Sequence, residues 1–414
     1  MTAPSGGLHI LLIHQLFVTH GQAGGTRHFE LARRWVAAGH RVSVVTGRRS
    51  YLSGAVHDVD EALPVGLEVV RVGTLPFAGG GFLARIANFV SFMVLALWTA
   101  LRIPDVDVVV GTTPPLFQAL AAAVGARLRG VPFVLEVRDL WPDFAIELGV
   151  LRSRPLIGLS RALERGLYRA ADRVVVNSPG FVEHVRARGA SAVAVVPNGV
   201  ETDDFDPDAH GTAFRERHRF APSDTLVLYA GAHGPPNDLG VVLDAADRTR
   251  DRPDLHWVLV GDGRDKARLV EQAGRRGLER VRFLPPIPKA DMPEVLAAAD
   301  VGLAILAPLA LFRTVYPNKV FDYMAAGRPV LLAIDGVIRQ VVEDGGAGRW
   351  VRAGDPDALA RAALAYADDP DRGRAEGRRG RQWVERHFQR AAQADRFLEA
   401  LAKVTGSADP DPFR

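Results

Sequence analysis

The stretch YPNKVFDYMAAGRP, residues 316–329, places a lysine and an aspartate three residues apart at the start of a short predicted helix. Pro317 suits the first turn, where its missing N–H would be unpaired anyway, and Gly327 suits the helix stop. Lys319 and Asp322 then share one face and lean toward the helix N-terminus. A cation beside free helix amides suits a diphosphate, and a carboxylate one turn further along suits a ribose diol. The competing interpretation is a surface ion pair, which would stabilise the helix by only about 0.2–0.5 kcal/mol.

The other residues of this predicted helix fall on two faces. Tyr323 and Ala326 come four and seven residues after Lys319 and share its predicted face. The residues predicted to face the core are Val320, Phe321 and Met324.

Glycine turns adjoin apolar runs at three further places. Each turn can present backbone N–H groups to an anion, and an ordinary flexible turn is the alternative. The third turn matches neither a P-loop nor a dinucleotide fingerprint, because the G-K-[ST] ending and the G-x-G-x-x-G spacing are missing. The glycine pairs are Gly24 and Gly25 before TRHFELARRW, Gly231 and Gly234 after TLVLYA, and Gly261 and Gly263 after LHWVLV.

Apolar strand-like runs alternate with helical patterns in both halves of the chain. The alternation predicts parallel strands joined by helical crossovers, so the expected fold class is α/β, with two doubly wound Rossmann-like domains. The runs are HILLIHQ, RVSVVTG, VDVVVG, PFVLEVRD and RVVVNSP, then TLVLYAG, LHWVLVGDG, VRFLPP, VGLAIL and PVLLAI.

The predicted domain boundary lies in VPNGVETDDFDPDAHG, where Pro, Gly, Asn and Asp replace the periodic pattern. We expect domains at 1–200 and 201–383, with a last helix at about 384–405 that packs back on the first domain. Ligands of such sheets bind beyond the carboxyl ends of the strands. Two domains that face each other would therefore enclose one cleft.

Composition narrows the function classes. The 414 residues are 48% apolar and 24% charged, which is average for a soluble globular protein. A formal charge of +3 does not require nucleic acid as a partner, and the arginines between Arg361 and Arg390 alternate with acids, as on a solvated helix face. The chain has no cysteine, which excludes disulfides and thiol nucleophiles. Met1–Gly7 lacks a basic n-region, so we expect no signal peptide and a cytoplasmic protein.

One long apolar stretch, Phe82–Leu101, has about the length of a membrane span. Four polar residues interrupt it, which disfavours a true span: Arg85, Asn88, Ser91 and Thr99. A buried core helix is the preferred interpretation. The alternative is a helix that lies in the membrane interface, with Trp98 near one end, which would place the protein peripherally on the inner face of the membrane.

The order of the motifs resembles the retaining nucleotide-sugar glycosyltransferases of family four, which have the GT-B fold. PNGV at 197–200, GDG at 261–263 and PNKVFDYMAAGRPVL at 317–331 carry this resemblance. GGTRHFELARRWVAAGHRVSVVT, GTTPPLFQALAAA and VRDLWPDFAIELGVL look like the subgroup that builds bacterial surface polysaccharides. The resemblance covers nearly the whole chain.

The resemblance implies a donor site around Lys319, which would also be the main catalytic residue, with Arg138 and Asp139 as further catalytic candidates. Asp322 stands where the family has the second glutamate of its E-x7-E motif, and Thr314 stands where it has the first. Sugar recognition must therefore differ from the family pattern. The family also carries an arginine and a lysine where this chain has His233 and Asn237, so positive charge must come partly from Arg27, Arg138, Arg264 or Lys266. The implied donor-binding residues are Gly24, Gly25, Asn198, Gly231, His233, Asn237, Gly261, Gly263, Lys266, Thr314, Tyr316, Asn318 and Asp322.

The function that follows is a retaining, metal-independent transferase that moves a hexosyl or N-acetylhexosaminyl group from a nucleoside-diphosphate sugar, preferably UDP-linked, to an acceptor hydroxyl. A saccharide or a lipid-linked saccharide would be the acceptor, and 82–101 would supply a peripheral membrane contact. The 12 histidines show no metal-ligand spacing, so we expect neither a metal nor a cofactor. A nucleotide-sugar epimerase and a non-catalytic nucleotide-sugar-binding protein remain as alternatives, because fold does not imply function.

Overall fold

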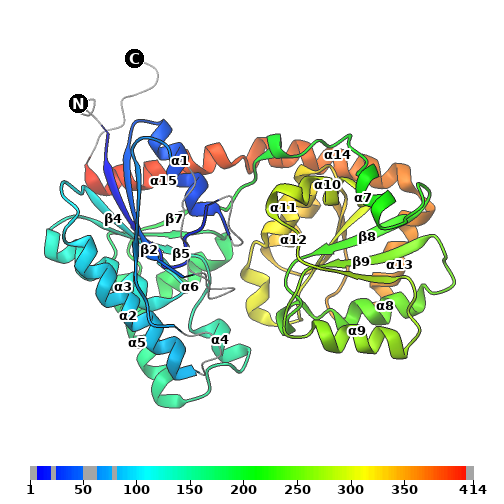
Figure 1. Ribbon diagram of the computed structural model, residues 1–414, viewed down its shortest axis with the longest axis horizontal. Helices are drawn as coiled ribbons and strands as arrows, with labels where there is room; N and C mark the ends of the chain where they lie inside the picture. Colours follow the sequence, from blue (N-terminus) through cyan, green and yellow to red (C-terminus); the bar gives the residue numbers. More distant parts are fainter. Residues whose placement is uncertain (1–6, 20–24, 50–62, 77–81, 407–414) are drawn as a thin grey trace. The chain divides into compact units, whose positions relative to one another are not determined.

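The computed structural model describes residues 7–19, 25–49, 63–76 and 82–406 (Figure 1). The chain divides into two compact units. Unit 1 comprises residues 1–197 and 391–414, and unit 2 comprises residues 198–390.

Within the described residues, unit 1 holds a seven-stranded parallel sheet in the order β3-β2-β1-β4-β5-β6-β7. The register places Ile10 of β1 opposite Val42 of β2 and Val108 of β4. Strands β1, β4 and β5 are buried at every position, as expected of parallel strands covered by helices on both faces. The strands are β1 His9–Ile13, β2 Arg41–Gly47, β3 Leu67–Val72, β4 Val108–Thr113, β5 Phe133–Val137, β6 Arg173–Val176 and β7 Val193–Val195.

Helices cover both faces of this sheet (Figure 1). On one face α1 and α15 meet, with the rings of Trp35 and Phe397 centred 5.1 Å apart over Ile10 and Leu12. The last helix of the chain therefore belongs to the core of unit 1. Helices α2, α3 and α5 pack side by side on the other face. The helices are α1 Arg27–Ala37, α2 Phe82–Ala100, α3 Leu116–Arg129, α4 Asp143–Glu147, α5 Arg154–Ala170, α6 Val182–Ala187 and α15 Arg390–Thr405.

The apolar stretch at 82–101 forms α2, and only one of its sides is core. Phe92 and Ala96 are fully buried, whereas Val94 and Trp98 are each 56% exposed. The interpretation of 82–101 as a buried core helix is therefore correct for one side of α2 alone. Within the described residues, no helix is both long and apolar enough to cross a membrane.

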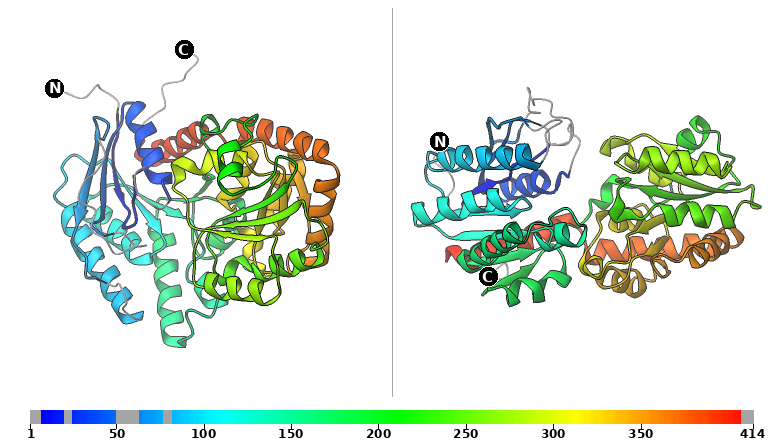
Figure 2. Two further views of the ribbon diagram at one scale, coloured as in Figure 1. Left: turned by 45° about the vertical axis from the view of Figure 1, so that its right-hand side comes forward. Right: turned by 90° about the horizontal axis from the view of Figure 1, so that it is seen from below.

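Unit 2 repeats the architecture of a parallel sheet between two helical layers (Figure 2). Within the described residues its sheet has six strands in the order β10-β9-β8-β11-β12-β13, so the order reverses between β8 and β11. Such a reversal leaves a crevice at the carboxyl ends of the two strands, where ligands of open α/β sheets bind. The strands are β8 Thr225–Ala230, β9 Leu255–Val260, β10 Val281–Leu284, β11 Val301–Ile305, β12 Val330–Ala333 and β13 Gly348–Trp350.

Separate apolar clusters fill the two faces of the second sheet. Helices α10, α11, α12 and α14 pack on one face around Val320, Phe321 and Met324, and α8, α9 and α13 pack on the other. The prediction that these three residues of α11 face the core is confirmed, since each is fully buried. The helices are α7 Thr212–Arg217, α8 Gly240–Arg248, α9 Lys266–Arg275, α10 Met292–Ala297, α11 Asn318–Ala325, α12 Val337–Asp344, α13 Pro356–Asp368 and α14 Pro370–His387, with 3₁₀ turns η3 Pro235–Asn237 and η5 Ala310–Thr314.

Both sheets confirm the predicted fold class of two Rossmann-like α/β domains. The strand-like runs of the sequence missed β3, β7 and β13. These strands lie at the edges of the sheets and contain exposed or half-buried positions, so they lack the continuous apolar run of an interior strand.

Candidate functional site

Lys319 stands in the first turn of α11, beside the carboxyl end of β8. Its ammonium lies 3.7 Å from the centre of the Tyr229 ring, on the ring's face. Lys319 forms no ion pair with any described residue, and the predicted alternative of a pair with Asp322 is not found. Burial lowers the pKa of Lys319 to about 7, because the surrounding protein disfavours the ammonium and no carboxylate offsets that cost. The protein thus holds an ammonium without a counter-anion at the crevice.

The turn after β8 is closed tightly around this lysine. Gly231 has φ +153°, and a Cβ there would lie 2.7 Å from the Lys319 Nζ. A Cβ on Gly261, the first residue after β9, would lie 1.9 Å from the carbonyl oxygen of Gly231. The Tyr229 hydroxyl donates to the carbonyl of Ala232 at 2.8 Å, which fixes the ring. Glycine at 231 and 261 therefore lets two strand ends approach each other and the lysine.

The third glycine turn is braced by Lys266. Its ammonium donates to the carbonyl oxygens of Gly261 at 2.6 Å and of Leu284 at 2.9 Å. A Cβ on Gly263 would lie 2.5 Å from the carbonyl oxygen of His233. Two of the three N–H groups of Lys266 therefore donate to carbonyls, which leaves one N–H for the phosphate contact that the sequence predicts.

His233 is fully enclosed by these turns. Burial and the nearby Lys266 lower the pKa of His233 to about 4, so the imidazole is neutral at physiological pH. Neither ring nitrogen has a hydrogen-bond partner within the part of the chain that the structure describes. His233 thus adds no positive charge to the crevice.

Asp322 and Tyr323 have different surroundings, although they are neighbours on α11. Asp322 is half-buried, and burial raises the pKa of its carboxyl to about 6, with Lys289 opposing the shift. Tyr323 is buried, accepts from the N–H of Ala230 at 3.1 Å and donates to the carbonyl of Leu303 at 3.1 Å. The prediction that Tyr323 and Ala326 share an accessible face with Lys319 is wrong, because neighbouring elements bury both residues.

The remaining predicted donor residues of unit 2 lie near the start of α11 or on neighbouring turns. The Asn198 side chain donates to the Asn318 side-chain oxygen, which ties the start of unit 2 to α11. The Thr314 hydroxyl donates to the carbonyl of Leu311 at 2.6 Å. Tyr316 packs edge-on against Phe321, and Asn237 ends the short η3 turn after β8.

Unit 1 contains a buried polar network that the sequence analysis missed. Glu136, near the end of the interior strand β5, is fully buried and accepts hydrogen bonds from Arg27 Nε at 2.9 Å and from His28 Nε2. Burial alone would raise the pKa of Glu136, but His28 and Arg27 outweigh it and hold that pKa far below its usual range. Arg27 also donates to the carbonyls of Pro197 and Val196. The Arg27 guanidinium is therefore held by Glu136 and by two backbone carbonyls. This contact is a correction to the sequence analysis, which offered Arg27 as a source of positive charge for the donor.

The other predicted residues of unit 1 follow β5 or precede α1. Arg138 donates to the carbonyls of Thr113 and Pro114 at 3.3 and 3.1 Å, and Asp139 beside it is exposed. Gly25 is exposed just before α1, and Gly24 lies outside the described residues. Arg264, in unit 2, is exposed in the turn after β9.

Of two functional residues that the sequence analysis missed, one left a signal in the sequence. Glu136 is a charged residue inside the apolar run PFVLEV, and such a residue is rarely buried without a partner. Tyr229 occupies a strand end directly before a glycine turn, but no local pattern indicates that a lysine lies on its ring. Within the described residues, no group of three or more His, Asp or Glu side chains is arranged to hold a metal ion.

The arrangement around Lys319 suits a multiply charged anion. The unpaired ammonium, the start of α11 and the glycine turns after β8 and β9 meet at the point where the strand order reverses. A helix N-terminus presents free N–H groups, and their partial positive charge favours phosphate, whereas the N–H groups of Gly231 and Gly261 already donate to the carbonyls of Val260 and Leu284.

Known proteins match both halves of the chain. Residues 23–199 match the family model described as Glycosyl transferase 4-like domain, and residues 224–369 match Glycosyl transferases group 1. The chain is 30% identical over 308 residues to a protein of Escherichia coli (strain K12) described as the colanic acid biosynthesis glycosyl transferase WcaI, covering 71% of this chain and 75% of that protein.

Solved structures share the fold. Sucrose-phosphate synthase from Thermosynechococcus elongatus superposes with a TM-score of 0.78 at 19% identity, covering 97% of this chain and all of that chain. HepE of Anabaena, solved in complex with UDP and glucose, has a TM-score of 0.73 at 20% identity, covering 96% of this chain and all of that one. The chain therefore belongs to the glycosyltransferases of the GT-B fold, and it resembles the transferases that build bacterial surface polysaccharides.

Proposed function

We propose that the protein is a retaining glycosyltransferase that takes a sugar from a UDP-sugar and transfers it to an acceptor hydroxyl. The observation that carries this proposal is the unpaired Lys319 ammonium over Tyr229, at the crevice of the second sheet. In this proposal unit 2 binds the donor, and Lys319 neutralises its diphosphate. The UDP in the solved HepE complex supports a uridine nucleotide by analogy of fold.

The roles in unit 2 follow from charge. Asp322, half-buried one turn after Lys319, accepts hydrogen bonds from the ribose hydroxyls. The N–H groups of Gly231 and Gly261 already donate to the carbonyls of Val260 and Leu284, so the N–H groups of the first turn of α11 complete the diphosphate contact.

The reaction needs a stabilised leaving group more than it needs a nucleophilic side chain. The bond between the anomeric carbon and the β-phosphate oxygen breaks, and negative charge grows on the diphosphate while the sugar becomes oxocarbenium-like. A preorganised cation and fixed amides lower the energy of that state. The acceptor oxygen bonds to the anomeric carbon on the face that the diphosphate leaves, and its proton passes to the departing phosphate oxygen. Configuration is thereby retained.

Nucleotide release from a panel of nucleoside-diphosphate sugars tests the proposal. Purified protein is incubated with each donor, with and without a lipid extract of bacterial membranes, and free nucleotide is measured. We expect UDP release from one or a few donors, and release that depends on acceptor. A donor converted to an isomer without acceptor would instead favour the epimerase, and a donor bound but never turned over would favour the binding protein.

Donor affinity should depend on pH through Lys319 and Asp322. The pKa of Lys319 is lowered to about 7 and that of Asp322 is raised to about 6, so both carry their functional charge only between these values. Above about pH 7 the affinity for UDP-glucose should fall by up to about tenfold per pH unit, because the neutral amine no longer attracts the diphosphate. Below about pH 6 it should fall again, because a protonated Asp322 no longer accepts two ribose hydrogen bonds.

Calorimetric titration across about pH 5.5–8.5 measures this dependence, since the diphosphate of UDP-glucose is a diester with no titration of its own there. Lys319→Ala should abolish the alkaline fall and Asp322→Asn the acid fall. An affinity that is flat with pH in the wild type would contradict both assignments.

We further propose that unit 1 binds the acceptor at a membrane surface, with a lipid-linked saccharide as the acceptor. On α2 a stripe of exposed apolar side chains at helical spacing is flanked by Arg85 and Arg102, and the Arg102 guanidinium lies 3.3 Å from the centre of the Trp98 ring. Neighbouring helices add Leu128 and Leu159, which are 64% and 68% exposed. Exposed apolar residues flanked by arginines suit an anionic lipid surface. The indole of Trp98 and the guanidinium of Arg102 would lie at the level of the headgroups. The stripe consists of Val90, Val94, Leu95 and Trp98 on α2 and of Leu101 directly after it.

Co-sedimentation with vesicles that contain phosphatidylglycerol checks this contact. The wild type should sediment with the vesicles at low salt and less at high salt, because screening weakens the arginine contribution. Val94→Glu combined with Trp98→Glu should remove binding without loss of the melting transition, since both side chains are exposed. Val270→Glu, at an exposed site on α9, is the matched control. A wild type that stays in the supernatant at both salt concentrations would contradict the membrane contact.

A further inference from the structure

A pocket of about 370 Å³ opens at the carboxyl ends of β11, β12 and β13. Its walls come from the loop and the η5 turn after β11, from Ile334 and Asp335 after β12, and from the segment that begins at Trp350. None of Tyr229, Gly231 and Lys319 lines it, so it is separate from the phosphate crevice. Its volume lies within the range of about 300–1,000 Å³ that small-molecule sites occupy.

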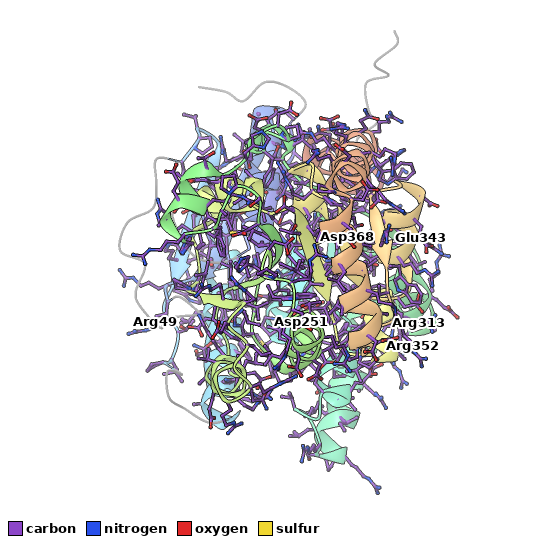
Figure 3. The ribbon with its side chains drawn as sticks, turned by 90° about the vertical axis from the view of Figure 1, so that its right-hand side faces the viewer. Arg49, Asp251, Arg313, Glu343, Arg352 and Asp368 are labelled. Carbon is purple, nitrogen blue, oxygen red and sulfur yellow. The ribbon has the colours of Figure 1, made fainter. Side chains whose placement is uncertain are left out.

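The pocket carries one uncompensated positive charge. Arg313 pairs with Asp335 at 3.0 Å, and Asp335 also lies 3.6 Å from Arg339, whose other partner is Glu343 at 2.7 Å. Arg352 is exposed and has no acidic partner among the described residues. Two arginines and one aspartate line the pocket, which leaves a net charge of one. Figure 3 labels Arg313 and Arg352 at this end of unit 2.

Trp350 supplies part of the apolar wall of the pocket. Its indole nitrogen is buried and has no hydrogen-bond partner within the described chain, although Arg339 lies 3.8 Å from the centre of its ring. That nitrogen has almost no accessible surface, so Trp350 meets a ligand in the pocket through the carbon atoms of its ring. Phe312 and Ile334 provide apolar wall beside it.

The walls are preformed. Gly336, at the start of α12, has φ +89°, and a Cβ there would lie 1.9 Å from the carbonyl oxygen of Arg313. The η5 turn is therefore packed directly on the segment that follows β12. A rigid wall lowers the entropy cost of binding, because little has to be ordered.

We propose that this pocket binds a sugar that carries a single carboxylate, a uronate. Arg352 pairs with the carboxylate, and the apolar wall of Trp350, Phe312 and Ile334 covers the C–H side of the sugar ring. One negative charge balances the pocket, whereas a sugar phosphate would bring a second. The class of ligand rests on the proposed function, since a polysaccharide transferase meets uronates either as the donor's glycosyl group or as a unit of its acceptor.

Tryptophan fluorescence of the whole protein tests the site without any transfer reaction. Sodium glucuronate should change the emission in a saturable manner, while glucose and sodium acetate at equal ionic strength should not. Trp350→Phe should remove the response. Arg352→Ala should weaken binding by about tenfold to a hundredfold, the value of a hydrogen bond to a charged group. Arg361→Ala, at an exposed arginine outside the pocket, is the matched control.

The proposal is overturned if glucose or acetate gives the same response, if Arg352→Ala binds glucuronate like the wild type, or if Arg361→Ala loses as much affinity as Arg352→Ala. Two nucleotide sugars distinguish whether the bound uronate belongs to the donor or to the acceptor. A donor role predicts that UDP-glucuronate binds more tightly than UDP-glucose and that Arg352→Ala removes the difference. An acceptor role predicts equal affinity for both. If the protein binds glucuronate but releases no nucleotide from any donor, the proposed uronate site stands and the proposed transferase activity is refuted.

Discussion

Replacement of Lys319 by alanine is expected to lower kcat by about a hundredfold or more, because removing one preorganised electrostatic contact to a developing charge typically costs that much. The Lys319 ammonium has no carboxylate to neutralise it, so its full charge is available to the leaving diphosphate. Tyr229 holds the ammonium from one side, with 3.7 Å between the Nζ and the centre of the ring. Nucleotide release with saturating donor measures the effect.

The Lys319→Ala protein should lose activity but remain folded. Burial lowers the pKa of Lys319, so the folded protein disfavours the ammonium, and its removal should leave the melting temperature unchanged or raised below about pH 7. Lys403→Ala, at an exposed lysine on α15, is the control. A Lys319→Ala protein with kcat within about threefold of wild type would remove Lys319 from the mechanism.

Replacement of Glu136 by alanine is expected to reduce the free energy of unfolding by about 3–5 kcal/mol, because it leaves a buried charge without its partner. Glu136 is the carboxylate that accepts from both Arg27 and His28 within the sheet of unit 1. Arg27 would keep its two backbone carbonyls but lose its counter-charge. Urea denaturation at neutral pH, followed by circular dichroism, measures the change.

At acid pH the free energies of unfolding of the wild type and the Glu136→Ala protein should come closer together. The folded-state pKa of Glu136 is depressed, so its contribution is present above the ordinary carboxyl pKa and is lost only as pH falls toward the depressed value. Glu183→Ala, at an exposed glutamate on α6, should change stability by less than about 0.5 kcal/mol. A Glu136→Ala protein as stable as Glu183→Ala would show that the network adds nothing to the folded state.

Local patterns in the sequence determined the fold class and one end of the candidate site. Interior parallel strands are continuous apolar runs, and ten such runs separated by helical patterns predicted two α/β sheets. Pro317 and Gly327 bounded α11 correctly, with Pro317 as the residue before the first turn. The sequence predicted that Lys319 and Asp322 lie on one face of that helix, because a helix brings residues three apart onto the same face.

Only the tertiary structure decided how these side chains are used. Lys319 lies on Tyr229 because β8 and α11 meet at the reversal of strand order, and no short-range periodicity encodes that order. Lys266 was predicted to bind phosphate, yet the carbonyls at the ends of β9 and β10 occupy two of its three N–H groups. The sequence suggested that Arg27 could contribute positive charge to the donor site. In the structure Arg27 pairs with Glu136, which lies far along the chain. A residue's charge can be read from sequence, but its partners depend on contacts between distant segments, which form only when the sheet is assembled.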